Sequence, residues 1–106
     1  MSIKTDIDPN AMRGAASQAS ELLKALSNQH RLMILCRLTE GEASVGELAK
    51  FLGIRDSTVS QHLSVLRRDG IIAGRREGQT IWYRIESGEA RDVVEVLYRS
   101  FCKPGR

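Results

Sequence analysis

Residues 44–70 read SVGELAKFLGIRDSTVSQHLSVLRRDG, and this stretch decides the fold. Ser44 and Glu47 have the spacing of a capping box, in which each side chain satisfies a backbone N–H of the other at the start of a helix. Gly53 suits the end of that helix because glycine tolerates positive φ. A short turn follows, and we expect Asp56 to be the N-cap of the next helix. Two short helices joined by a turn that contains glycine predict a helix-turn-helix.

The flanking sequence extends this pattern in both directions. Upstream, apolar residues recur at helical spacing and predict two helices, the first of which ends near Ser27. Downstream, β-branched and aromatic runs on either side of a charged, glycine-containing tip predict a β-hairpin over residues 71–85. Ser87 then caps a last helix that ends near Cys102. The predicted fold class is therefore mainly α with a β-hairpin wing, a winged helix-turn-helix in the order α-α-α-α-β-β-α.

Length and composition limit what the chain can do. With 106 residues and a mass of 11.8 kDa, it has room for one domain, and we expect no second, catalytic domain. We expect residues 1–10 to be a flexible N-terminal tail and residues 11–106 to form the domain for DNA binding and dimerisation. No stretch approaches the roughly 20 consecutive apolar residues that span a bilayer. The N-terminal segment resembles neither a signal peptide nor a transit peptide, so we expect a cytoplasmic protein.

Positive charge gathers in the second half of this pattern, where residues 57–84 hold five arginines and two acidic residues. In the predicted helix over residues 57–68, Val59, Leu63 and Leu66 fall on one face and leave a polar face on the other side. Such a face on an isolated helix would most simply meet water, but the helix-turn-helix context favours DNA. Hydroxyl, amide, imidazole and guanidinium groups bind base edges and phosphates. The predicted DNA-binding residues are Ser57, Thr58, Ser60, Gln61, His62, Arg67, Arg68, Arg75 and Arg76.

Five segments taken together resemble the ArsR family of winged helix-turn-helix repressors. They are LSNQHRL at 26–32, SVGEL at 44–48, STVSQHL at 57–63, LRRDG at 66–70 and WYR at 82–84. The resemblance implies a homodimer that binds double-stranded operator DNA, packs its first and last helices at the two-fold axis, and releases DNA when an effector binds. It also implies a protein that is not an enzyme and needs no cofactor. A thiol oxidoreductase would require a close Cys-x-x-Cys pair, which the sequence lacks.

The chain has two cysteines, Cys36 and Cys102, and in a cytosolic protein such a distant pair is no disulfide framework. Free cysteines are often ordinary buried hydrophobic residues. The positions of these two, however, resemble the dithiol of the sulfide- and persulfide-responsive ArsR subgroup that includes SqrR and BigR. That resemblance implies a bridge between the two thiols of one protomer, formed with reactive sulfur species. Arg37 and Arg99 should favour thiolate at the neighbouring cysteines, and the carbonyl end of the last helix should oppose it at Cys102.

Two alternatives use the same scaffold. A zinc-responsive repressor would need about four N, S or O ligands. The predicted third helix has no cysteine, and the last has Glu89, Asp92 and Glu95 but no histidine, so we predict no metal site. A general regulator that responds to peroxide or disulfide stress remains open. The sequence leaves open the operator, the target genes, and the choice between a repressor and an activator that relieves silencing.

Overall fold

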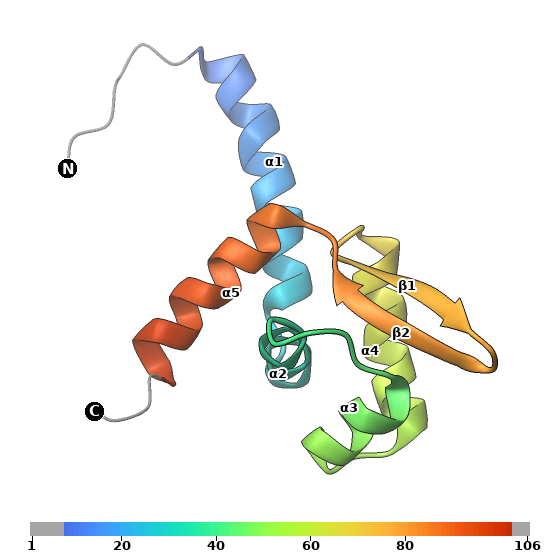
Figure 1. Cartoon of the computed structure of the whole chain (residues 1–106). Coiled ribbons are helices and arrows are strands. Elements are labelled where there is room, and N and C mark those ends of the chain that lie inside the picture. Colours follow the sequence, from blue (N-terminus) through green and yellow to red (C-terminus); the bar gives the residue numbers. More distant parts are fainter. Residues whose placement is uncertain (1–7, 103–106) are drawn as a thin grey trace.

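Helix α2 lies at the centre of the fold in the computed structural model, which describes residues 8–102 (Figure 1). The predicted order of helices and strands is confirmed. The two strands form one antiparallel hairpin, in which Ile72 pairs with Ile85 and Glu77 pairs with Thr80. The elements are α1 (Pro9–Leu26), α2 (Gln29–Leu38), α3 (Val45–Leu52), α4 (Asp56–Arg68), β1 (Ile72–Glu77), β2 (Thr80–Ile85) and α5 (Gly88–Phe101).

Local capping residues set the helix ends that the sequence predicted. The Ser44 hydroxyl accepts a hydrogen bond of 3.2 Å from the backbone N–H of Glu47, whose carboxylate accepts one of 3.2 Å from the Ser44 N–H. Gly53 ends α3 in the left-handed conformation, with φ of 70°. Ser87 accepts a hydrogen bond of 3.0 Å from the N–H of Ala90 at the start of α5. The capping box, the glycine stop and the Ser87 cap are therefore confirmed.

Two helix starts differ from the prediction by one or two residues. Arg55 is the N-cap of α4, and Asp56 is already helical, so the prediction of Asp56 as N-cap was wrong. The Arg55 carbonyl accepts the first hydrogen bonds of the helix, and the Asp56 carboxylate still lies in the first turn, where the helix dipole favours an anion. Helix α1 begins at Pro9, after Asp8 as N-cap, within the segment expected to be a tail. The rest of that predicted tail, residues 1–7, lies outside the described residues.

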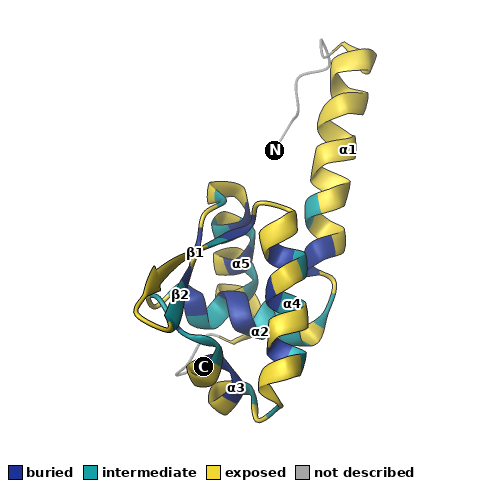
Figure 2. Cartoon of the chain, turned by 90° about the vertical axis from the view of Figure 1, so that its right-hand side faces the viewer, coloured by how far each residue is buried: buried dark blue, intermediate teal, exposed yellow. Residues whose placement is uncertain are grey.

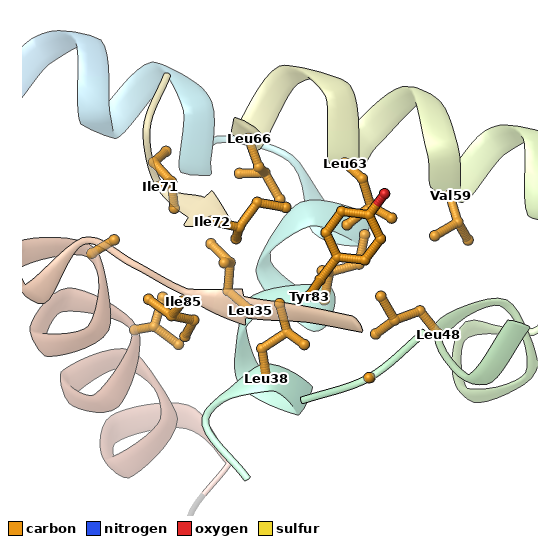
Figure 3. Close-up of a cluster of buried hydrophobic side chains, with 14 of the residues drawn as sticks. Leu35, Leu38, Leu48, Val59, Leu63, Leu66, Ile71, Ile72, Tyr83 and Ile85 are labelled. Atoms are coloured by element: carbon orange, nitrogen blue, oxygen red, sulfur yellow. The ribbon is translucent and has the colours of Figure 1, made fainter. Parts of the chain in front are cut away.

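One cluster of buried apolar side chains joins α2 to the helix-turn-helix and the wing (Figure 3). Leu35 and Leu38 of α2 are buried in it together with the side chains of α4 that the sequence placed on the apolar face. Two members of this cluster, Ala43 and Tyr83, exchange two backbone hydrogen bonds, of 2.9 and 3.2 Å. The bridge attaches the segment between α2 and α3 to strand β2. It therefore fixes the wing relative to the helix-turn-helix.

Only the last turn of helix α1 is buried in the core, and the turns before it extend away from the core. Only Ala25 and Leu26 of α1 are buried, while Met12 and Leu23 remain 49% and 56% exposed (Figure 2). Among residues 8–102, no helix is both long and apolar enough to cross a membrane. The chain by itself thus leaves most of the apolar residues of α1 in contact with solvent.

Candidate DNA interface and dithiol groove

Helix α4 presents one polar, exposed face beside its buried face (Figure 2). Val59, Leu63 and Leu66 are buried, as the spacing predicted. Thr58 and His62 are half-buried at the edge of the polar face. The fully exposed members of the predicted DNA-binding set are Ser57, Ser60, Gln61, Arg67 and Arg68 on α4, and Arg75 and Arg76 on the wing. A continuous polar surface is therefore available on the second helix of the helix-turn-helix pair.

His62 also contacts residues of α2. The guanidinium of Arg31 lies 3.4 Å from its Nδ1, and the His30 ring lies at a centroid distance of 5.5 Å with edge-to-face geometry. Arg31 in turn donates a hydrogen bond of 2.6 Å to the carbonyl of Ala25 near the end of α1. Burial and the charges of Arg31 and His30 lower the pKa of His62. The neutral imidazole can accept from Arg31 at Nδ1 and present an N–H donor at Nε2.

The two wing arginines have different surroundings. Arg75 binds the carboxylate of Glu42, with its Nε at 3.0 and 3.1 Å from the two oxygens and its Nη2 at 2.9 Å from Oε1. This hydrogen bond holds the pKa of Glu42 below its ordinary value. Arg76 is exposed, and no ion pair joins it to any residue from 8 to 102. The structure therefore leaves Arg76 open to an external anion, while Arg75 already has an internal one.

Cys36 and Cys102 line the same groove between α2 and α5, although they lie in distant parts of the sequence. We call it the dithiol groove. Cys36 is half-buried on α2, and Cys102 is the exposed C-cap of α5. The groove has a volume of about 610 Å³, within the range of small-molecule sites. The structure thus brings together the two thiols that the sequence singled out.

The expectation that Arg37 promotes a thiolate at Cys36 was wrong. Burial raises the pKa of the Cys36 thiol, and a negative charge on Cys102 raises it further. The Arg37 guanidinium donates a hydrogen bond of 3.3 Å to the carbonyl of Gly41, in the turn that follows α2. Although Arg37 is adjacent to Cys36 in the sequence, its guanidinium binds a backbone carbonyl and does not lower the pKa of the Cys36 thiol.

Groups of three or more His, Cys, Asp or Glu side chains that could hold a metal are absent from the part of the chain that the structure describes. In particular, the acidic residues of α5, Glu89, Asp92 and Glu95, do not converge with a histidine there. Within residues 8–102 the structure therefore has exposed polar and cationic groups on α4 and the wing, and two thiols that line one groove.

Comparison with known proteins places this site in a family. Residues 28–73, which include the helix-turn-helix, match the model for the arsR family of bacterial regulatory proteins. The chain is 45% identical over 92 residues to the transcriptional activator HlyU of Vibrio cholerae, a match that spans 87% of this chain and 85% of the relative. The chain belongs to the arsR family. It is a transcription regulator, and its relatives include both an activator and repressors.

A second arsR-family relative is the biofilm growth-associated repressor of Agrobacterium fabrum. It is 47% identical over 94 residues, which are 89% of this chain and 80% of the repressor. Solved structures agree with the fold. Reduced HlyU from Vibrio cholerae has a TM-score of 0.84 at 44% identity and covers 87% of this chain and 97% of its own. The repressor BigR from Xylella fastidiosa has a TM-score of 0.81 at 42% identity over 93% and 98%. These matches place the chain beside HlyU and BigR within the arsR family.

A homodimeric winged helix-turn-helix domain from Mycobacterium bovis, a possible ArsR-family regulator, is more distant. It has a TM-score of 0.75 at 29% identity, over 94% of this chain and 89% of that domain.

Reasoning from the sequence missed the residues that contact the candidate site residues His62 and Arg75, and most of those that line the dithiol groove. Arg31 lies inside the segment LSNQHRL, which carried the resemblance, but nothing in that segment indicates a contact with α4. Glu42 gave no signal, because its partner Arg75 is distant in sequence. Phe51 and Phe101 line the dithiol groove, but in the sequence their only signal is the spacing of apolar residues along a helix. These contacts depend on how separate elements pack.

Proposed function

We propose that the chain is a cytoplasmic, homodimeric transcriptional repressor whose affinity for double-stranded operator DNA is switched by the Cys36–Cys102 dithiol. Reactive sulfur species are the effector, and the repressor needs no cofactor and has no enzymatic activity. The observation that carries the proposal is that both thiols line one groove between α2 and α5. The similarity to BigR and HlyU supports the regulatory part of the proposal.

In this proposal α4 reads the operator in the major groove. Ser57, Thr58, Ser60, Gln61 and His62 bind base edges or nearby phosphates, and Gln61 has the bidentate amide that suits adenine. His62 contributes the Nε2 donor that its contact with Arg31 leaves outward. Arg67, Arg68 and Arg76 bind phosphates, and Arg75 does so after exchanging Glu42 for the DNA backbone.

The switch acts by tying α5 to α2. Helix α2 packs against α3 and α4, so it supports the helices that meet DNA, whereas α5 is expected to set the geometry of the dimer. A bridge between Cys36 and Cys102 therefore changes the spacing of the two recognition helices. Allosteric coupling of about 1 to 3 kcal/mol corresponds to a roughly 5- to 150-fold loss of operator affinity. A plain disulfide needs Cα atoms within about 7 Å, and each inserted sulfur lengthens the reach by up to about 2 Å, which favours polysulfide bridges in a wider pair.

The test combines intact mass spectrometry with operator binding. Reduced protein treated with a glutathione persulfide donor should gain sulfur within one protomer and release DNA, while Cys36→Ser and Cys102→Ser should stay bound. Parallel samples are treated with hydrogen peroxide or with zinc. Release of DNA by one of these alone would favour the peroxide or the metal alternative, respectively. Normal release of DNA by both Ser variants would show that the thiols are structural and would contradict the proposal.

A further inference from the structure

The walls of the dithiol groove are apolar over almost their whole area. They come from α2, α3 and α5, and no lining residue within the described range carries a charged side chain. Apart from the thiols, the polar groups of the lining are the Gln29 amide and the Tyr98 hydroxyl. The apolar walls are formed mainly by Leu32, Met33, Phe51, Leu97 and Phe101. A charged molecule in this groove would lose hydration without meeting an opposite charge among the lining residues of the described range, whereas an apolar molecule would bury surface.

We propose that this groove binds an uncharged polysulfide with apolar end-groups and directs its central sulfur to Cys36 and Cys102. The inference rests on the proposed dithiol function and specifies its substrate class. The walls favour apolar end-groups, and the two thiols in the lining supply the nucleophiles that can open the S–S bonds of a polysulfide. Anionic persulfides and peptide-sized carriers such as glutathione match the lining less well, because each carries charges that no lining residue among residues 8–102 neutralises.

The reaction balances without a further oxidant. The Cys102 thiolate attacks the central sulfur of a trisulfide R–S–S–S–R, an S–S bond breaks, and one RS⁻ leaves with the electron pair of that bond. Cys36, after losing its proton, attacks the same central sulfur and displaces the second RS⁻. The products are a Cys102–S–S–S–Cys36 bridge and two RSH molecules, which carry the two protons that the cysteines lost. The cysteine pair is oxidised by two electrons and the trisulfide is reduced by two.

Exposure and charge set the order of the two steps. Cys102 is exposed at the end of α5, so it is the thiol that an incoming molecule meets first. Burial raises the pKa of Cys36, and a charge on Cys102 raises it further. Reaction at Cys102 removes that charge and so makes the second deprotonation easier. We therefore expect a mixed trisulfide to accumulate on Cys102 in Cys36→Ser, and slow reaction at Cys36 in Cys102→Ser.

The experiment compares two trisulfides that share the reacting atoms and differ at their ends. Dipropyl trisulfide is uncharged and apolar, and glutathione trisulfide is charged and polar. The rate of bridge formation is measured by intact mass as the gain of one sulfur and the loss of two hydrogens. It is divided by the rate at which each reagent consumes N-acetylcysteine. We expect this normalised rate to favour dipropyl trisulfide by roughly tenfold, the scale expected for burying about two methylene groups.

A matched pair of variants locates the preference in the groove. Phe51 lines the groove, and its exposed neighbour Lys50 on α3 does not. Phe51→Gln should reduce the preference for dipropyl trisulfide by about threefold, and Lys50→Gln should leave it unchanged. Phe51 is 52% exposed, so the variant should fold, which circular dichroism checks.

Two outcomes overturn the inference. The first is that the two trisulfides have equal normalised rates, which would reject the apolar substrate. The proposed function would remain intact in that case if DNA release by glutathione persulfide still required both cysteines. An unchanged preference in Phe51→Gln, together with a loss of dimer in sedimentation, would assign the groove to a second copy of the chain. Failure of the proposed function has a different signature, because both Ser variants would then release DNA normally.

Discussion

At the scale of single residues, His62 stands where α4 meets the end of α1 and the start of α2. Arg31 contacts its Nδ1 and also binds the carbonyl of Ala25, so one guanidinium links three helices. The contact occupies Nδ1, so Nε2 is the imidazole nitrogen left for the proposed contact with DNA. A residue that the sequence suggested only as a base reader is thus also part of the internal structure, which constrains its position on the operator.

The His62 pKa provides the first prediction. Burial lowers it, and so do the charges of Arg31 and His30, so the folded state binds this proton less tightly than the unfolded chain does. The contribution of His62 to stability is therefore complete above pH 6.5, its ordinary pKa, and declines as the pH falls below that value. Arg31→Met should raise the pKa of His62 but leave it below 6.5, because burial remains. NMR titration of the imidazole Cε1–H measures it, and an unchanged pKa would contradict the contact.

His62→Gln checks the sign of this dependence. Urea unfolding of the wild-type chain at pH 7.5 and 5.5 measures the change in the free energy of unfolding between these pH values. Both His62 and the carboxylates contribute to that change. The variant should lose less stability than the wild type across this interval, because it lacks the depressed imidazole. A larger loss in the variant would show that the sign is wrong.

The close packing around Gly74 supports a second prediction, which concerns the cost in stability of adding one methyl group there. A Cβ at this position would lie 2.8 Å from Cγ2 of Ile81 and 3.2 Å from Cε1 of Tyr83, so a neighbour would have to move. Gly74→Ala should therefore destabilise the protein by about 1 to 3 kcal/mol. Gly88 has nothing within 4 Å and serves as the control. Gly88→Ala should change stability by less than about 1 kcal/mol in urea unfolding. Equal costs in the two variants would mean that the wing accommodates the methyl group.

At the scale of elements, the wing depends on a contact between Arg75 and the segment between α2 and α3. Exposed ion pairs contribute little to stability, so Glu42→Gln should leave the unfolding curve nearly unchanged. The substitution removes a carboxylate that competes with phosphate for Arg75. We expect it to raise affinity for all DNA sequences alike and to steepen the dependence of log K on log salt by about one. Fluorescence anisotropy over a salt series measures both effects.

Two further variants separate wing and helix effects. Arg76→Ala should weaken all sequences alike and flatten the salt dependence by about one. Gln61→Ala on α4 should instead cost roughly 1 to 3 kcal/mol at the operator and relax the preference at one position of each half-site.

If Glu42→Gln weakened binding, Glu42 would be holding Arg75 in its binding position rather than competing for it.

The elements were predictable where short-range chemistry decides them. The Ser44–Glu47 capping box, Gly53 and the apolar face of α4 involve residues within a few positions of one another, and all were confirmed. The start of α4 was missed by one residue, because Arg55 caps the helix with its backbone and carries no side-chain signal. The Arg31–His62 and Arg75–Glu42 contacts join residues more than 30 positions apart, so they depend on the packing of elements. The groove between α2 and α5 has the same origin.

At the scale of the whole molecule, α1 extends away from a core that buries only its last turn (Figure 2). Its apolar residues Met12 and Leu23 are exposed, and so is Val96 on α5. These side chains are the surface that a dimer would bury, in keeping with the expected packing of the first and last helices at a two-fold axis. Such a dimer would place two α4 helices for the two halves of a palindromic operator.

Leu23→Glu tests this assembly without touching the core or the dithiol groove, because Leu23 is 56% exposed and lines neither. A carboxylate at the two-fold axis would be buried without a partner, so we expect the wild-type chain to sediment as a dimer at micromolar concentration and the variant as a monomer. Glu21→Leu, a reverse change at an exposed position of α1, is the control for altered charge on that helix. Affinity for a two-half-site operator should fall steeply in Leu23→Glu, while affinity for a single half-site should stay close to wild type, since each protomer keeps its own α4. A wild-type monomer, or a variant that keeps both its mass and its operator affinity, would show that α1 does not form the interface.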